Sequence, residues 1–141
     1  MWEKSYSKTF KGVTREKIWE VLTDFHNWPT WQSDLAYCKL LGKREVGSSF
    51  ELKPKKGPKV RIQILEFKKP IFLVDLTKFP GAKMYGIHHL EKTKEGVRLT
   101  TTMRMTGFLG FLWRKLVAED IMKHEPDQME ALVERAKNPK K

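Results

Sequence analysis

The feature that most constrains this chain is a two-residue period of apolar and polar side chains that recurs between Leu35 and Thr106. Successive side chains of a β-strand point to opposite faces of its sheet, so this period predicts strands with one buried face. Prolines and glycines interrupt the period, as expected for turns. The predicted strands are 35–41, 49–53, a segment from Val60 to the Lys68–Pro70 break, 71–79, 82–91 and 97–106. The connections are short, which favours sequential antiparallel pairing.

The flanking segments complete the predicted α+β fold. Residues 4–10 alternate as a first strand, and Thr14 is placed to cap a helix whose apolar residues follow at helical spacing. Residues 28–32 predict a second helical turn or a tight loop, because Pro29 interrupts them. After Gly107 the period is helical, with a kink expected at Pro126. A sheet with one apolar face needs a cover, and this C-terminal helix is the long element available.

Length and composition narrow the class of protein. A chain of 141 residues has the size of one domain, predicted as 1–137 with a frayed basic tail at 138–141. No long apolar run is present, and the N-terminal residues lack an apolar signal core, so we expect a cytoplasmic protein. Cys38 is the only cysteine, which excludes an internal disulfide. Asp120 and His124 have ligand spacing without a third partner, so we predict no metal site. The sequence has no phosphate loop and no dinucleotide fingerprint, and we expect no cofactor.

The positive charge is concentrated in one stretch. Between residues 39 and 69 there are ten basic and three acidic residues, a net +7 of the chain's +11. Such a surface could bind phosphates, but no recognition helix or RNA-binding motif accompanies it, and we do not expect nucleic acid as a partner. A solvated lysine face is the first interpretation, and transient contact with an anionic membrane surface is the second.

The order of the turns predicts where a pocket would open. In an antiparallel meander alternate turns lie at the same end of the sheet. This end would collect aromatic residues and lysines, which suit a cavity mouth or a surface that touches anionic lipid. The aromatics could instead simply cap the core. The predicted mouth residues are Trp28, Trp31, Lys55, Lys56, Phe79 and Phe108.

Three stretches of sequence resemble a known family. These are Ile18-Trp-Glu-Val-Leu-Thr-Asp-Phe-His-Asn-Trp-Pro-Thr-Trp31, Gly47-Ser-Ser-Phe50 and Thr106-Gly-Phe-Leu-Gly-Phe-Leu-Trp113. Together they resemble the START-like helix-grip (SRPBCC) superfamily, and within it the bacterial polyketide cyclase/dehydrase and lipid-transport family. The resemblance implies a curved seven-stranded sheet wrapped around the C-terminal helix, with two short helices between strands 1 and 2. Members bind lipids, polyketides, hormones or other apolar molecules in a cavity, and a minority are enzymes.

The first functional hypothesis is a carrier or sensor of a small hydrophobic or amphipathic ligand. The predicted cavity wall consists of the inward-facing apolar residues of the strands and of the last helix. These are Phe50, Leu52, Val60, Ile62, Ile64, Leu99, Met103, Met105, Leu112, Leu116 and Ile121. A protein-binding module is a third hypothesis, because a related branch activates a chaperone ATPase. The sequence does not define the oligomeric state.

The second hypothesis is a cyclase or dehydratase that uses general acid/base catalysis. His88 is predicted to face inward with Met84, where an imidazole could act as a base. Asp75 lies in an apolar run, where a carboxylate needs a partner such as His88 or an arginine. Tyr85 is the third candidate. His88 and Asp75 each have a structural alternative: a core or surface histidine, and an aspartate facing solvent. An inward His–carboxylate pair would favour the enzyme, and an entirely apolar cavity would favour the carrier.

Overall fold

The computed structural model describes residues 1–138. It contains seven strands, two short helices after the first strand, and a long helical segment at the C-terminal end. The strands are β1 (Trp2–Phe10), β2 (Leu35–Leu41), β3 (Ser49–Pro54), β4 (Val60–Lys68), β5 (Phe72–Phe79), β6 (Ala82–Lys92) and β7 (Val97–Thr106). The helical elements are α1 (Arg15–Thr23), η1 (Phe25–Thr30), α2 (Gly110–Trp113), η2 (Arg114–Ala118) and α3 (Glu119–Lys137).

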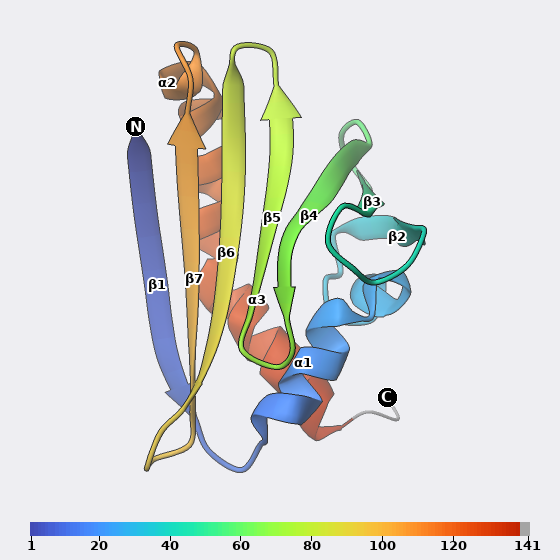
Figure 1. The fold of residues 1–141 in the computed structure, drawn as a ribbon, viewed down its shortest axis with the longest axis vertical. Coiled ribbons are helices and arrows are strands. Elements are labelled where there is room, and N and C mark those ends of the chain that lie inside the picture. Colours follow the sequence, from blue (N-terminus) through green and yellow to red (C-terminus); the bar gives the residue numbers. More distant parts are fainter. Residues whose placement is uncertain (139–141) are drawn as a thin grey trace.

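The strands form one antiparallel sheet in the order β1-β7-β6-β5-β4-β3-β2. Figure 1 shows the sheet in front of α3, with β4, β3 and β2 bending away from the plane of the other strands. The pairing register shifts between Ile64 and Glu66 in β4, and between Leu35 and Tyr37 in β2. Such bulges bend a strand and increase its twist. The predicted helix-grip fold is therefore confirmed, with strand ends within one or two residues of those expected.

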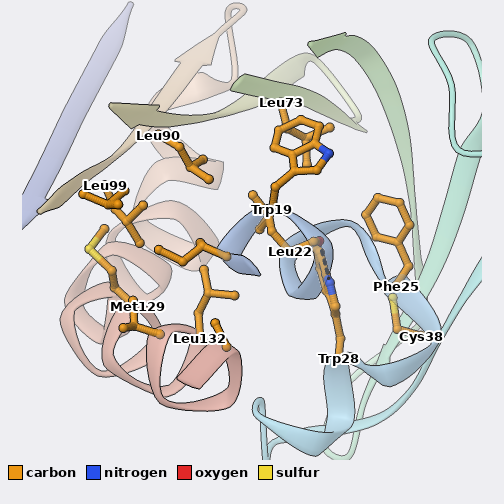
Figure 2. Packing of buried hydrophobic residues seen from close by; sticks show 14 of the residues in the cluster. Trp19, Leu22, Phe25, Trp28, Cys38, Leu73, Leu90, Leu99, Met129 and Leu132 are labelled. Carbon is orange, nitrogen blue, oxygen red and sulfur yellow. Dashed lines mark hydrogen bonds between the residues drawn. The ribbon is translucent and has the colours of Figure 1, made fainter. Parts of the chain in front are cut away.

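The first helix begins where the sequence predicts. The Thr14 side chain accepts a hydrogen bond from the amide of Lys17 at 3.2 Å, which caps α1. The next segment, η1, is a 3₁₀-helix that includes Pro29, in agreement with the predicted short turn. The indole Nε1 of Trp28 donates to the carbonyl of Leu22 at 2.9 Å and ties η1 to α1. Figure 2 shows this bond among the buried side chains.

The C-terminal helical segment has an irregularity that the sequence did not predict. Residues 114–118 form a π-helical turn, and Pro126 lies within α3, which is helical on both sides of it. A π-turn contains one more residue than an α-turn, so it rotates the side chains on one side of it relative to the other. It places Val117, Ala118 and Met122 toward the sheet. Leu112 and Leu116, predicted to face a cavity, are exposed instead.

The buried apolar residues form two separate clusters. The main core lies under α1, η1 and the second half of α3, and Figure 2 shows Trp19, Leu73, Leu90 and Met129 packed within it. The methionine cluster lies nearer α2 and is built from Met84, Met103, Met105, Met122 and two alanines. Polar side chains of β5, β6, β7 and α3 lie between the two clusters and form the candidate site, while Tyr6 of β1 packs against both clusters. Asn138 ends the described chain, and positions 139–141 of the predicted tail lie outside it.

Candidate functional site

A layer of polar side chains separates the two apolar clusters. We define the polar layer as Asp75 on β5, His88 on β6, Thr101 on β7 and Glu125 on α3. The alternation of β7 explains its position, because Thr101 stands between Leu99 of the main core and Met103 of the methionine cluster on the same face. A polar side chain between buried apolar neighbours needs a hydrogen-bond partner.

On β6 and α3 as well, polar residues interrupt an apolar face. On β6 the inner face runs from Met84 through Gly86 and His88 to Leu90. On α3 Glu125 stands between Met122 and Met129, at helical spacings that share one side. The polar layer therefore crosses three strands and one helix at a single level of the fold.

The layer is continuous from β5 to α3. His88 and Thr101 are direct partners in the β6–β7 register, so their side chains are neighbours on one face. His88 also reaches β5, where its Nε2 lies 3.2 Å from Oδ2 of Asp75. Burial raises the pKa of the Glu125 carboxyl on α3 and the Thr101 hydroxyl acts to lower it, which places the two groups near each other. The sequence predictions that His88 faces inward and that a histidine accompanies Asp75 agree with this geometry.

Gly86 makes room for the carboxylate of Asp75. The two residues are register partners on β5 and β6. A Cβ atom at position 86 would lie 2.6 Å from Oδ1 of Asp75, closer than real Cβ contacts. The missing side chain therefore lets Asp75 lie over the neighbouring strand and meet His88, two residues further along β6.

The surroundings of His88 favour its charged form. Burial lowers the pKa of His88, but the hydrogen bond and charge of Asp75, with the charge of Glu125, raise the pKa above its ordinary value of 6.5. The side chains of His88 and Asp75 remain 23% and 14% exposed, so this pair is not sealed inside the core. The pair can exchange a proton with a bound molecule or with water.

Glu125 was missed in the sequence analysis. Burial raises the pKa of its carboxyl above 4.5, and the charge of Asp75 acts in the same direction, while His88 and Thr101 oppose the shift. A carboxyl with a raised pKa can donate a hydrogen bond or a proton. The available signal was its spacing from Met122 and Met129, which places a carboxylate on the apolar side of the helix.

Tyr85 does not join the polar layer. Tyr85 lies on the same outer face of β6 as His89. It is opposite Leu76 in the β5–β6 pairing and opposite Arg104 in the β6–β7 pairing. Strand alternation prevents His88 and Tyr85 from facing the same side. Of the three predicted catalytic candidates, the structure therefore brings His88 and Asp75 together and places Tyr85 on the opposite face, while Glu125 is the carboxyl on the facing helix.

The predicted wall residues divide between the two clusters. Most lie on the inner side of the fold, and the two exceptions are in the helical segment that contains the π-turn. The main core includes or contacts Phe50, Leu52, Ile62, Ile64 and Leu99, and the methionine cluster includes or contacts Met103, Met105 and Ile121. Val60 is partly buried at the start of β4. Leu112 and Leu116 are exposed, so the prediction that they line an interior cavity is not met.

The predicted mouth residues have three different environments. Trp28 is buried against Phe25 and Phe50, so it caps the core rather than lining an opening, and Trp31 packs on its edge. Phe79 is stacked on Trp113 with ring centroids 4.6 Å apart. Lys55, Lys56 and Phe108 are exposed.

Two surface pockets lie outside the polar layer. One, of about 570 Å³, lies between β1 and the η2–α3 segment and is lined by Trp2, Lys4, Arg114, Lys115, Glu119, Asp120 and Lys123. The other, of about 500 Å³, lies beside α1 and η1 and includes Trp31, Arg44 and Arg135. Neither of these two is lined by the predicted wall residues. Within residues 1–138, no group of three or more His, Cys, Asp or Glu side chains is arranged to hold a metal ion.

Comparison with known proteins decides the family. The family model described as polyketide cyclase/dehydrase and lipid transport matches residues 1–136. The chain belongs to this family. No curated protein matches the sequence. The family and the helix-grip fold together support binding of small hydrophobic ligands, without naming the ligand of this member. Among the described residues, no helix is long and apolar enough to cross a membrane.

Solved structures share the fold of this family member at low sequence identity. A protein from Nitrosomonas europaea has a TM-score of 0.78 at 18% identity, covering 98% of this chain and 96% of that one. A protein from Thermus thermophilus has a TM-score of 0.73 at 14% identity, covering 99% of both chains. The di-domain ARO/CYC protein StfQ of the steffimycin biosynthetic pathway has a TM-score of 0.79 at 12% identity, covering 97% of this chain and 51% of that one.

Proposed function

We propose that this protein is a carrier or sensor that binds a small amphipathic ligand, such as a lipid or polyketide, between the sheet and α3. The observation that carries the proposal is the polar layer between two apolar clusters. A ligand with a hydroxyl, carbonyl or carboxyl group could form hydrogen bonds with these polar side chains, whereas a purely apolar ligand could not. The proposal treats residues 1–137 as one ligand-binding domain that acts in the cytoplasm.

A buried acceptor on α3 supports a polar ligand. Oε1 of Gln128 is buried and has no hydrogen-bond partner among the described residues. Gln128 follows Glu125 by three residues, so the two side chains are neighbours on the helix. A buried acceptor without a partner is costly, and a donor on the ligand would satisfy it.

Native mass spectrometry of the freshly purified protein, followed by solvent extraction, tests the proposal. We expect a stoichiometric adduct that carries a polar group, and we expect His88→Leu to reduce its occupancy. His89→Leu, on the outer face of the same strand, serves as the matched control. A purely hydrocarbon adduct, or equal occupancy in His88→Leu, would contradict the role of the polar layer.

The second candidate function is a cyclase or dehydratase, and the His88–Asp75 pair is the observation that favours it. If Asp75 accepts a hydrogen bond from Nε2–H of the neutral imidazole, Nδ1 carries no proton and can act as a base. Nδ1 would remove the proton α to a ligand carbonyl, and the protonated Glu125 carboxyl would donate to the carbonyl oxygen. The electron pair of the C–H bond then forms the enol, and the proton resides on His88.

Proton exchange measures this activity without a known substrate. The probe is 2-tetralone in deuterated buffer, with mass spectrometry reporting deuterium at the α-carbon. The enzyme hypothesis predicts exchange above the buffer rate, reduced in His88→Gln and unchanged in the outer-face variant His89→Gln. Exchange at the buffer rate in the wild-type protein would reject proton abstraction from this class of ketone.

A further inference from the structure

The segment that links β7 to α3 presents a cluster of exposed apolar side chains. Phe108, Phe111, Leu112 and Leu116 are 81%, 61%, 41% and 62% exposed, and we call these four residues the apolar patch. They lie within nine consecutive residues at the end of the sheet that carries the β5–β6 turn, where Figure 1 shows α2. Single exposed apolar residues are common, but such a cluster marks an interaction surface.

The backbone under the apolar patch is held firmly. The amide of Leu109 donates to the carbonyl of Gly81 at 2.9 Å, and Nε1 of Trp113 donates to the carbonyl of Pro80 at 2.9 Å. The Trp113 ring also stacks on Phe79. The inward side of the segment is thus occupied by Leu109 and Trp113, and the patch residues cannot turn inward together without displacing them.

Positive charge surrounds the apolar patch. Lys78 and Lys83 are exposed register partners beside the β5–β6 turn, and Lys83 also pairs with Thr106, two residues before Phe108. Lys115 lies within the patch segment and is exposed. The adjacent pocket adds Lys4 and Lys123, against the carboxylates of Glu119 and Asp120. Glu119 is paired with Arg114, and Asp120 with His124.

We propose that the apolar patch docks this protein on an anionic lipid bilayer. Aromatic and leucine side chains at the tip would enter the headgroup boundary, and the surrounding lysines would contact anionic headgroups. A second copy fits less well, because a symmetric contact through the patch would bring the same lysines together. This inference does not depend on the interior ligand, and it gives a location at which an amphipathic ligand could be collected or released.

Vesicle co-sedimentation tests the inference directly. The probes are vesicles of phosphatidylcholine alone and of equal parts phosphatidylcholine and phosphatidylserine. We expect binding to the anionic vesicles that weakens as salt is added, because salt screens exposed charges. The variant Phe108→Ser/Leu116→Ser should lose most of this binding. Val46→Ser is the matched control, because Val46 is 59% exposed in the loop before β3 and should retain binding.

Charge variants separate docking from general attraction to a basic protein. Lys83→Gln/Lys115→Gln should weaken anionic binding several-fold. Lys11→Gln/Lys94→Gln removes the same charge from exposed positions at the other end of β1 and β6, and should have little effect. Equal loss in both double variants would overturn the inference, as would unchanged binding in the patch variant or no binding by the wild type.

Sedimentation velocity identifies the alternative occupant. We expect a monomer whose sedimentation is the same in the wild type and in Phe108→Ser/Leu116→Ser. A dimer that the double variant converts to a monomer would assign the apolar patch to self-association and overturn the membrane inference. Circular dichroism of each variant confirms that the fold is retained. Failure of vesicle binding with retained ligand binding would leave the proposed function intact.

Discussion

Nε2 of His88 and Oδ2 of Asp75 lie 3.2 Å apart, although the two residues are not opposite one another in the sheet. Asp75 is opposite Gly86, and His88 is opposite Leu73. The pair is therefore diagonal, and it exists because position 86 has no side chain to separate the two groups. The polar layer depends on this relationship.

Gly86→Ala should disrupt the pair. The added Cβ would meet the Asp75 carboxylate at 2.6 Å, and moving a carboxylate within the fold should reduce stability by about 1–3 kcal/mol. Urea unfolding measures the change. Gly110→Ala is the matched control, because its Cβ would meet the flexible Met105 side chain at 3.3 Å. Equal stability of the two variants would show that Gly86 does not make this space.

Asp75→Asn should lower the pKa of His88. The charge of Asp75 is one of the interactions that raise this pKa above 6.5, and asparagine removes the charge while keeping a similar shape. An NMR titration of the imidazole signals measures the pKa directly. Glu91→Gln, on the outer face of the same strand, removes one carboxylate and should leave the pKa of His88 unchanged.

Glu125→Gln should change how stability depends on pH. The pKa of Glu125 is raised in the folded protein, so the folded state binds more protons than the unfolded state above pH 4.5. The contribution of this group to stability is present below pH 4.5 and is lost as the pH rises through its folded pKa. The pKa of His88 is also raised in the folded protein, so its contribution to stability is present below pH 6.5 and is lost as the pH rises through its folded pKa.

The glutamine variant should therefore gain stability relative to the wild type as the pH rises from 4.5. Chemical unfolding at several pH values measures this difference. A constant difference across the range would contradict a raised pKa for Glu125. Glu134→Gln is the control, because it removes an exposed carboxylate from the same helix.

Phe50→Ala should strongly destabilise the protein without any ligand. Phe50 is fully buried, stacks on Phe25 with centroids 4.3 Å apart and contacts the edge of Trp28. Loss of a buried phenylalanine costs about 3–5 kcal/mol. Phe111→Ala, at an exposed position, should stay within about 0.5 kcal/mol of the wild type in the same unfolding assay. Similar changes in unfolding free energy for the two substitutions would contradict a core role for Phe50.

The sheet could be predicted from sequence because alternation is a local property. Each strand carries its own inward face, and the cap at Thr14 uses residues within one turn. The exposure of Leu112 and Leu116 could not be predicted in this way, because an α-helical period cannot show the extra residue of the π-turn at 114–118. The contacts that hold the segment before this turn join Trp113 to Pro80 and Leu109 to Gly81, which are distant in the sequence.

The site was only partly predictable for a related reason. The parity of β6 placed His88 inward, and the apolar run of β5 indicated that Asp75 needs a partner. Their meeting depends on the register that sets Gly86 opposite Asp75, which the sequence does not specify. Glu125 joins them through the packing of α3 on β7, a contact between distant segments.

Binding of 2-naphthol and naphthalene tests the central claim most directly, because these two molecules differ by one hydroxyl. Isothermal titration of the wild type, the inner-face variants Thr101→Val and His88→Leu, and the outer-face control Thr102→Val compares the two affinities. The polar layer predicts tighter binding of 2-naphthol, a preference that Thr101→Val and His88→Leu reduce and Thr102→Val leaves unchanged. Equal affinity for both molecules in the wild type, or a preference that survives both inner-face substitutions, would contradict the account.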